Sequence, residues 1–206
     1  MAGFSTDESL ISALLDGSDA GFVYAVKQYQ PGMRQLAISI CGEAISDEVV
    51  QEAWFSAIRS LSRFEGRSSL KTWLLRIVAN EAKSRLRREN RLTSLEALTQ
   101  DDENFVNRFD ERGHWSIYPS DWHVSSPDEL ISSEQLQQCL NTLIAALPDL
   151  QSATLQLKEH QNYSLHEICN ILEVSESNVR VLLHRARQRL YRCIEHFQAT
   201  GECCTT

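Results

Sequence analysis

Apolar residues recur every three or four positions along most of this 206-residue chain, a spacing that places them on one face of an α-helix. The pattern predicts a short helix at about 10–15, a second at about 19–29 that Pro31 breaks or kinks, and a third at 33–42. Stretches of alternating apolar and polar residues, which indicate β-strands, are few. The sequence therefore predicts an all-α fold.

Two longer helices follow in the same half of the chain. Ser46 is expected to cap the first of them, because Asp47 and Glu48 then lie in its first turn, where carboxylates suit the helix dipole. Ser68 or Ser69 is expected to cap the second, which reaches about residue 90. The apolar stripe predicted for the first helix consists of Val49, Val50, Ala53, Trp54, Ala57, Ile58 and Leu61.

The helical pattern is lost over residues 93–132 and resumes beyond them. This linker is too long for an ordinary turn, and its segment 113–123 carries aromatic residues that predict some contact with the rest of the chain. Helices are expected at 133–146 and 149–160, and Ser164 with Glu167 forms a capping box that begins a helix at 165–172. We thus predict two small helical domains, 1–92 and 133–197, joined by an acidic linker at 93–132 and followed by a cysteine-containing tail at 198–206.

The net charge of −8 conceals a strong segregation of charge along the sequence. Residues 96–135 hold ten acids and two bases, whereas residues 71–91 hold seven bases and two acids. Residues 175–192 hold five arginines and one acid. Because charges are screened over about 8 Å in physiological salt, a distant acidic segment does not cancel a basic helix face.

The arginine-rich segment follows the helix at 165–172 after only three residues, a spacing typical of a helix-turn-helix. Its predicted buried stripe is Val179, Leu182, Leu183, Ala186 and Leu190. The polar positions off this stripe are Ser177, Asn178, Arg180, His184, Arg185, Arg187 and Gln188. A solvated arginine face is the alternative, but one acid cannot pair five arginines, so the pattern favours DNA binding.

The second basic segment has a similar division of faces. Arg76, Asn80, Lys83 and Arg87 follow one another at helical spacing, while Leu70, Trp73, Leu74, Ile77 and Val78 lie on another face. A loop rich in Gly and Ser precedes this helix, and a basic face beside a polar loop suits an unstacked base as well as duplex DNA. A charged face in solvent is the alternative interpretation.

Composition excludes several other classes of protein. No run of eighteen apolar residues exists and the acidic N-terminus does not resemble a secretory signal, so we expect a cytoplasmic protein without a membrane span. No catalytic motif or phosphate-binding loop is present, which predicts no enzyme activity and no cofactor.

The cysteines are expected to be reduced, and Cys41, Cys139, Cys169 and Cys193 to be small helical core residues. For the tail, three hypotheses stay open: unordered reduced thiols, an oxidation-sensitive Cys203–Cys204 pair, or a metal site. The sequence predicts no metal site by any standard motif, and the weak candidate ligands are Cys193, His196, Cys203 and Cys204.

Two stretches carry a resemblance to a known family. "SDEVVQEAWFSAIRSLSRFEGRSSLKTWLLRIVANEAKSRLRREN" resembles region 2, and "ALPDLQSATLQLKEHQNYSLHEICNILEVSESNVRVLLHRARQRL" resembles region 4, of bacterial sigma factors of the ECF (extracytoplasmic function) group. The resemblance implies that RNA polymerase core, through its beta and beta-prime subunits, and promoter DNA are partners, and that an anti-sigma factor is a further one. It also implies that the acidic linker threads the polymerase toward the RNA exit path, although a solvated tether is the alternative.

The resemblance also assigns roles to residues. It places polymerase binding on Asp47, Glu48, Gln51 and Glu52. It places binding of the melted minus-ten element on Phe64, Arg67, Ser68, Ser69, Lys71, Trp73, Arg76, Asn80, Lys83, Arg87 and Arg88. It places minus-thirty-five recognition on Ser177, Asn178, Arg180, His184, Arg185 and Arg187. The sequence departs from the family pattern at Ser84, where aspartate is usual, at Cys169, where alanine is common, and at Glu173, where the turn commonly has glycine.

The leading hypothesis is therefore an alternative sigma factor that directs promoter recognition, DNA melting and transcription initiation. A sigma-like decoy that binds an anti-sigma factor without binding DNA is the alternative, but it would need neither basic face. An ordinary helix-turn-helix repressor is a third possibility, and it does not explain the acidic "DEVVQE" helix followed by a basic one.

Overall fold

The computed structural model describes residues 4, 6–88 and 134–204, and every regular element in them is a helix. The predicted all-α fold is therefore confirmed for this part of the chain. The chain divides into two compact units, one formed by residues 1–92 and 156–176 and the other by 93–155 and 177–206. The predicted linker and its aromatic segment 113–123 lie outside the described residues.

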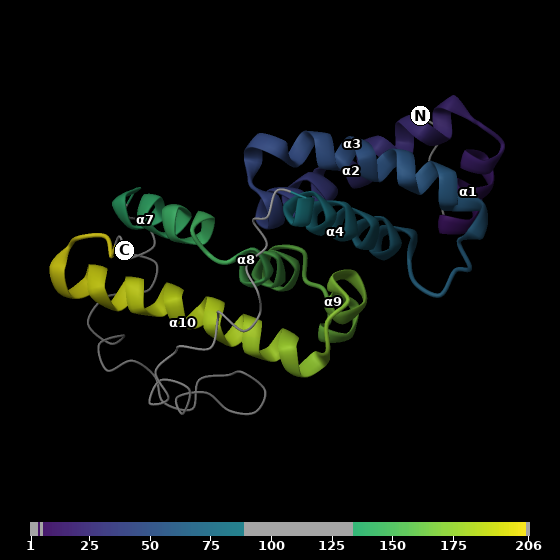
Figure 1. Cartoon of the computed structure of the whole chain (residues 1–206). Helices are drawn as coiled ribbons and strands as arrows, with labels where there is room; N and C mark the ends of the chain where they lie inside the picture. The colour runs from purple at the N-terminus through teal and green to yellow at the C-terminus, as the bar shows by residue number, and fades with distance from the viewer. Residues whose placement is uncertain (1–3, 5, 89–133, 205–206) are drawn as a thin grey trace. The chain divides into compact units, whose positions relative to one another are not determined.

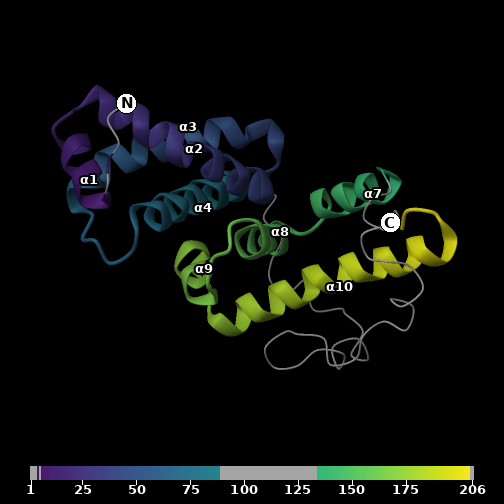
Figure 2. The same cartoon turned by 180° about the vertical axis from the view of Figure 1, so that it is seen from behind.

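The first unit is built around a layer of three long helices. Its elements are α1 (Asp7–Leu15), α2 (Asp19–Cys41), α3 (Glu43–Ser60), the short 3₁₀ turn η1 (Leu61–Arg63) and α4 (Leu70–Arg88), followed by the π-helical turn η3 (Gln156–His160) and α9 (Leu165–Leu172). Helices α2, α3 and α4 pack side by side, as Figures 1 and 2 show from opposite directions. Helix α9 packs against α4 in the same unit.

Helix α4 supplies much of the core of this unit. Its fully buried side chains recur every three or four residues: Leu70, Leu74, Leu75, Val78, Ala79, Ala82 and Leu86. Partners from the other helices include Leu36 and Ile40 of α2 and Val49 and Val50 of α3. Burying one such leucine or valine stabilises the fold by about 1.5–3 kcal/mol, so this stripe fixes which face of α4 points outward.

Helix α2 continues through Pro31, so the predicted break at this residue is wrong. Proline cannot donate a backbone hydrogen bond and costs about 3 kcal/mol or more inside a helix. Buried side chains on both sides of it, among them Ala25, Met33 and Leu36, gain their packing only if the helix continues. Tertiary packing therefore outweighs the local preference.

Helix α3 begins earlier than the sequence predicted. It starts at Glu43, directly after Gly42, whose φ of 80° lies in the left-handed region that favours glycine. Ser46 is thus not the N-cap: it is fully buried, and its hydroxyl donates a 2.9 Å hydrogen bond to the carbonyl of Glu43. Ile58, predicted in the buried stripe, is 48% exposed, while Val49, Val50, Ala53, Ala57 and Leu61 are buried as expected.

The start of α4 is held by two side chains. The backbone N–H of Thr72 donates to the Ser69 hydroxyl at 3.1 Å, so Ser69 is the cap of the two serines that the sequence left open. The N–H of Leu70 donates to the carboxylate of Asp7 at 2.8 Å, which links α1 to α4. Tyr29 also donates to Asp7, and burial together with this carboxylate raises the pKa of Tyr29 to about 12.

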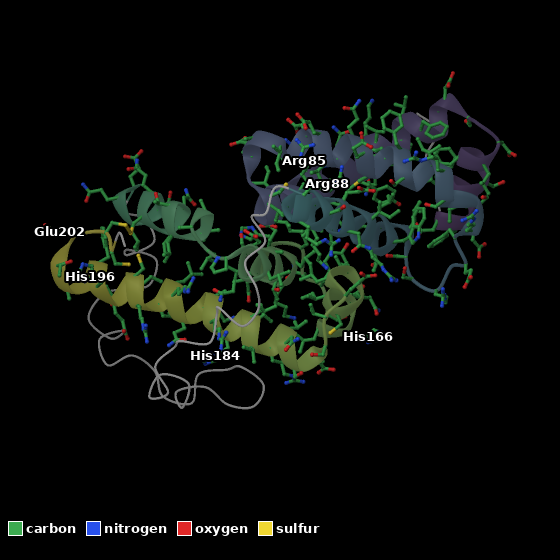
Figure 3. All side chains as sticks on the ribbon, viewed as in Figure 1. Arg85, Arg88, His166, His184, His196 and Glu202 are labelled. Carbon is green, nitrogen blue, oxygen red and sulfur yellow. A yellow bond between two sulfur atoms is a disulfide. The ribbon has the colours of Figure 1, made fainter. Side chains whose placement is uncertain are left out.

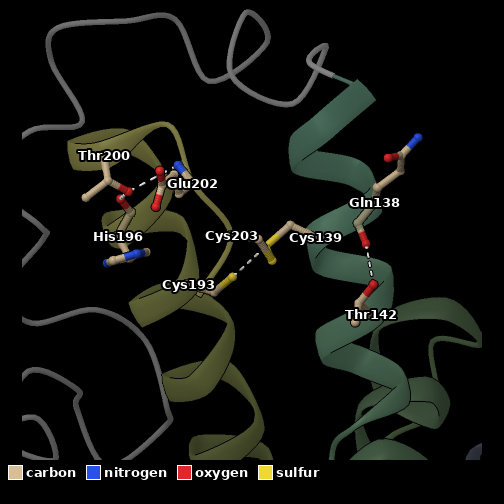
Figure 4. The surroundings of a disulfide bond; sticks show 8 residues. All are labelled: Gln138, Cys139, Thr142, Cys193, His196, Thr200, Glu202 and Cys203. Atoms are coloured by element: carbon tan, nitrogen blue, oxygen red, sulfur yellow. Dashed lines mark hydrogen bonds between the residues drawn. A yellow bond between two sulfur atoms is a disulfide. The ribbon is translucent and has the colours of Figure 1, made fainter. Parts of the chain in front are cut away.

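The second unit contains α7 (Glu134–Ala145), α8 (Asp149–Leu155) and almost all of α10 (Glu176–Thr200). Leu147, Leu155 and Ala186 form an apolar cluster, against which Leu190 packs. A disulfide joins Cys139 of α7 to Cys203, and the tail is therefore ordered up to this point rather than a reduced and unordered segment (Figure 4). Helix α10 extends three residues beyond the predicted domain end at 197.

The capping box of α9 has the predicted form. The N–H of Glu167 donates to the Ser164 hydroxyl, and the N–H of Ser164 donates to the Glu167 carboxylate at 2.9 Å. These bonds hold the pKa of Glu167 below its ordinary value. Within the described ranges, no helix combines the length and apolar character that a membrane crossing requires.

The two serines before α4 provide a matched test of this capping arrangement. Ser69→Ala should lower the free energy of unfolding by about 1 kcal/mol, because the Thr72 N–H loses its acceptor. Ser68→Ala should change it by less than half as much, because the bond that the Ser68 hydroxyl makes among the described residues goes to the Ser69 carbonyl and to no helix N–H. Urea unfolding followed by tryptophan fluorescence measures both. Equal losses for the two variants would contradict the assignment of Ser69 as the cap.

Candidate functional site

The four acidic and amide residues predicted to bind polymerase lie together on the exposed side of α3. Asp47, Glu48, Gln51 and Glu52 are all exposed, since their spacing of one and four positions leaves them opposite the buried stripe. Arg34 of α2 pairs with Asp47 at 2.8 Å, and Arg85 of α4, which Figure 3 labels, pairs with Glu48 at 3.1 Å. The structure thus brings these four residues onto one surface, which we call the acidic face.

Two exposed apolar residues extend the acidic face along α3. Phe55 is 51% exposed and Ile58 is 48% exposed, and they follow Gln51 and Glu52 by one helical turn or two. Large apolar side chains on a surface cost free energy unless a partner covers them. The sequence did not indicate that Ile58 is exposed, because Ile58 fits the apolar period of α3. Phe55 lies off the predicted apolar stripe, and this position was the sequence signal for its exposure.

The loop before α4 is held at both ends. Phe64 packs against Trp73 of α4, with ring centroids 5.1 Å apart. Ser69 caps the helix, as described above, and Ser68 is partly buried. Between these points Arg67 is strongly exposed and pairs with Glu65 at 2.9 Å. The loop therefore presents a guanidinium and hydroxyl groups from a backbone whose ends are fixed.

A small cavity lies next to this loop. Ten apolar or aromatic side chains of α1, α2, α3, η1 and α4 line it, including Trp54, Ile58 and Trp73. The indole N–H of Trp54 is buried and has no hydrogen-bond acceptor among the described residues. The cavity walls are thus apolar and partly aromatic.

The basic face of α4 contacts α9 within the first unit. Arg76 donates two hydrogen bonds to one carboxylate oxygen of Glu173, at 2.9 and 2.5 Å, and Asn80 donates to the same side chain. These donors hold the pKa of Glu173 below its ordinary value, so the carboxylate is ionised at neutral pH. Lys83 donates to the carbonyl of Leu172, and burial lowers the pKa of its ammonium group.

Glu173 reaches this position from a strained backbone. Its φ of 55° and ψ of 46° are left-handed, as expected for a residue in a turn that commonly has glycine. This conformation costs a non-glycine residue roughly 1 kcal/mol. In return, the carboxylate lies at the end of α9, where Arg76 and Asn80 bind it.

The remaining predicted minus-ten residues are distributed along the same helix. The ammonium group of Lys71 lies 5.0 Å from the ring centre of Tyr163, a cation–π distance. Arg87 and Arg88 are exposed in the last turn of α4 (Figure 3 labels Arg88). The sequence correctly placed Arg76, Asn80 and Lys83 on one face, but it gave no sign that α9 packs there.

The predicted minus-thirty-five residues lie on α10. Ser177 and Arg180 are exposed, whereas Asn178, His184, Arg185 and Arg187 are partly buried; Figure 3 labels His184 on this helix. Val179, Leu182, Leu183 and Ala186 are buried as predicted, and Leu190 is partly buried. Gln188 was expected among the outward residues, but it is only 1% exposed.

The weak candidate metal ligands are only partly brought together. The sulfurs of Cys193 and Cys203 lie close to that of Cys139. Cys139 was predicted to be a core residue and was not among the candidate ligands. His196 is not part of this group. No sequence rule pairs cysteines so far apart, so this group could be found only in the folded chain.

Comparisons with known proteins agree with this arrangement. Residues 25–92 match the family Sigma-70 region 2, and residues 137–190 match the family Sigma-70, region 4. The chain is 31% identical over 152 residues to a protein named "Probable RNA polymerase sigma factor" from Haemophilus influenzae, covering 73% of this chain and 77% of that protein. It is 30% identical to the ECF RNA polymerase sigma-E factor of Escherichia coli, over 90% of this chain and 92% of that protein.

Solved structures share the fold at lower sequence identity. The sigma factor RpoE of Bartonella quintana, solved in complex with the anti-sigma factor NepR, matches with a TM-score of 0.53 at 20% identity over 88% of this chain and 98% of that one. CnrH, in complex with the cytosolic domain of CnrY, matches with a TM-score of 0.53 at 18% identity over 92% and 97%. The sequence matches show that this chain belongs to the ECF group of RNA polymerase sigma factors, which are transcription initiation factors and not enzymes.

Proposed function

We propose that this chain binds core RNA polymerase, recognises the minus-ten and minus-thirty-five elements of its promoters, melts the DNA and starts transcription. The observation that carries the proposal is the separation of charge within one small unit: an exposed acidic face on α3 and a row of cationic side chains on α4. A decoy for an anti-sigma factor would use neither the cationic groups of α4 nor those of α10.

The acidic face is the proposed polymerase contact. Family resemblance assigns Asp47, Glu48, Gln51 and Glu52 to the coiled coil of the beta-prime subunit. Exposed Phe55 and Ile58 next to them supply the apolar area that a stable interface needs at its centre. The ion pairs that Arg34 and Arg85 make with Asp47 and Glu48 orient these carboxylates before binding.

The loop at 64–69 and the adjacent cavity are the proposed minus-ten site. A base that leaves the stack can lie against an aromatic ring beside the loop, such as that of Trp73. Arg76 and Lys83 would follow the strand backbone. DNA phosphate would then have to replace Glu173 at Arg76 and the Leu172 carbonyl at Lys83, so we infer that α9 leaves the basic face of α4 when the promoter binds.

Helix α10 is the proposed minus-thirty-five reader. Residues at the start of a recognition helix reach base edges in the major groove, whereas later cations reach phosphates. Ser177, Asn178 and Arg180 lie at the start of α10. Arg185 and Arg187 are the later cations, and His184 lies between the two groups.

An anti-sigma factor is proposed as a further partner, because the two similar solved structures are of proteins complexed with an anti-sigma factor or with the cytosolic domain of another protein. The proposed place of action is the cytoplasm, where polymerase and promoter DNA are found.

The whole proposal predicts promoter-dependent activity from two components. Purified chain added to core RNA polymerase should produce run-off transcripts from a subset of genomic promoters, and core alone should not. Sequencing of the transcript starts would give the promoter elements. A chain that binds an anti-sigma factor but yields no transcripts from any genomic template would instead support the decoy.

The polymerase contact is tested by charge reversal. Glu52→Lys should reduce binding to core polymerase at least tenfold, because like charges at a specific interface repel by several kcal/mol. Glu8→Lys, an equal charge change on exposed α1, is the control and should bind as the wild type does. Both variants should remain helical by circular dichroism. Undiminished co-purification of Glu52→Lys with core would exclude α3 as the docking surface.

Two of the arginines of α10, Arg180 and Arg187, are expected to contribute to DNA binding in different ways. Arg180→Ala should cost about 1–3 kcal/mol and relax the base preference at one upstream position. Arg187→Ala should weaken binding to all promoters alike and reduce the dependence of binding on salt. Binding to a randomised minus-thirty-five library at several salt concentrations measures both. An unchanged base preference for Arg180→Ala would remove it from the base-reading residues.

A further inference from the structure

Three cysteines of the second unit converge, although they come from three separate places in the chain. The sulfurs of Cys139 on α7, Cys193 on α10 and Cys203 in the tail all lie within 4.8 Å of one another (Figure 4). Cys139 is 3% exposed and Cys193 is fully buried. The Sγ atoms of these two residues are 3.2 Å apart.

The end of α10 brings the tail to this point. Gly201 has a φ of 71°, in the left-handed region, and its N–H donates to the carbonyl of Phe197 at 2.8 Å. The N–H of Glu202 then donates to the Thr200 hydroxyl at 3.1 Å. The chain thus turns back along α10 at a glycine, and Cys203 meets Cys139 instead of pointing away from the unit.

Cys204 adds a fourth sulfur. Its thiol is hydrogen-bonded to that of Cys193, although its sulfur is not one of the three that lie within 4.8 Å of one another. In Figure 4 the ring of His196 does not point toward the sulfurs, and it is outside the group. The donor set is therefore sulfur only, with two sulfurs from the helices and two from the tail.

We propose that Cys139, Cys193, Cys203 and Cys204 bind one Zn²⁺ ion when the Cys139–Cys203 bond is reduced. Three converging sulfurs and a fourth next to one of them supply the four thiolates that tetrahedral zinc takes, and a sulfur-only set selects a soft cation over magnesium or calcium. On binding, the four thiols lose four protons and the ion takes four Zn–S bonds. The disulfide and the zinc site exclude each other, because the disulfide uses two of the four ligands.

The site is independent of promoter binding, since none of its residues belongs to the proposed polymerase or DNA surfaces. It joins the tail to both α7 and α10 in the reduced protein, as the disulfide joins the tail to α7 in the oxidised one. Reducing conditions, which remove disulfides, are thus the conditions in which zinc would replace the covalent link.

The experiment uses the full-length chain, reduced under argon with a phosphine, which takes up oxygen from water as it converts the disulfide to two thiols. After removal of metals, Zn²⁺ is titrated against a coloured chelator, and Co²⁺ is used as a spectroscopic probe. We expect one ion per chain, with the visible bands of tetrahedral cobalt and thiolate charge-transfer absorption. Zinc should also protect Cys139, Cys193, Cys203 and Cys204 from alkylation, as mass spectrometry of the peptides measures.

Cysteine variants test whether zinc binds at this site or to any thiol of the chain. Cys204→Ser, in the tail, should keep the fold and lose stoichiometric zinc binding, and Cys139→Ser should do the same if it folds. Cys41→Ser and Cys169→Ser lie on α2 and α9 and should bind one zinc as the wild type does. The proposal is overturned if the reduced wild type binds no zinc, or if Cys204→Ser and Cys139→Ser bind it as tightly as the wild type.

Discussion

The requirement that α4 be buried along one stripe and charged along another determines how the first unit is arranged. Leu70, Leu74, Val78 and Ala82 have to lie in the core, and this fixes the rotation of the helix about its axis. This rotation also determines the direction in which Arg76 and Lys83 point. Asp7 and Ser69 accept hydrogen bonds from the first N–H groups of the helix and so fix where it starts. The loop at 64–69, the aromatic cavity and the cationic row therefore keep a constant geometry relative to one another. The proposed DNA-binding surface is thus produced by packing, not by any one of its polar residues.

Local signals in the sequence were sufficient for much of the fold. Ser164 and Glu167 are three residues apart and bond to each other's backbone, so their role could be predicted without knowledge of tertiary structure. Glu173 was expected to take a left-handed conformation from its place in the turn, and it does. The acidic residues of α3 are exposed because they lie opposite a stripe of apolar residues that the periodicity revealed. Their role as a polymerase contact stays a prediction.

The errors have physical causes that lie outside the local sequence. Pro31 did not interrupt α2 because residues on both sides of it are buried, and Gly42 moved the start of α3 ahead of Ser46. Gln188 is buried although its chemistry suggests exposure, and Ile58 is exposed although its spacing suggests burial. The α9–α4 contact and the Cys139–Cys203 bond join residues far apart in sequence. No periodicity encodes such pairs, because helical spacing constrains only near neighbours.

The Cys139–Cys203 bond makes a closed covalent ring out of a large part of the C-terminal sequence, with a separation of 64 residues between its ends. Helices α8, α9 and α10 and the turn at Glu173 lie inside the ring. A ring of this size restricts the unfolded chain by an amount equivalent to about 4 kcal/mol in the chain-entropy account. The restriction acts on the unfolded ensemble and not on native contacts. A single backbone cut anywhere within the ring would therefore leave its two pieces tethered to each other. Redox state thus governs whether a nicked α10 stays attached to the protein.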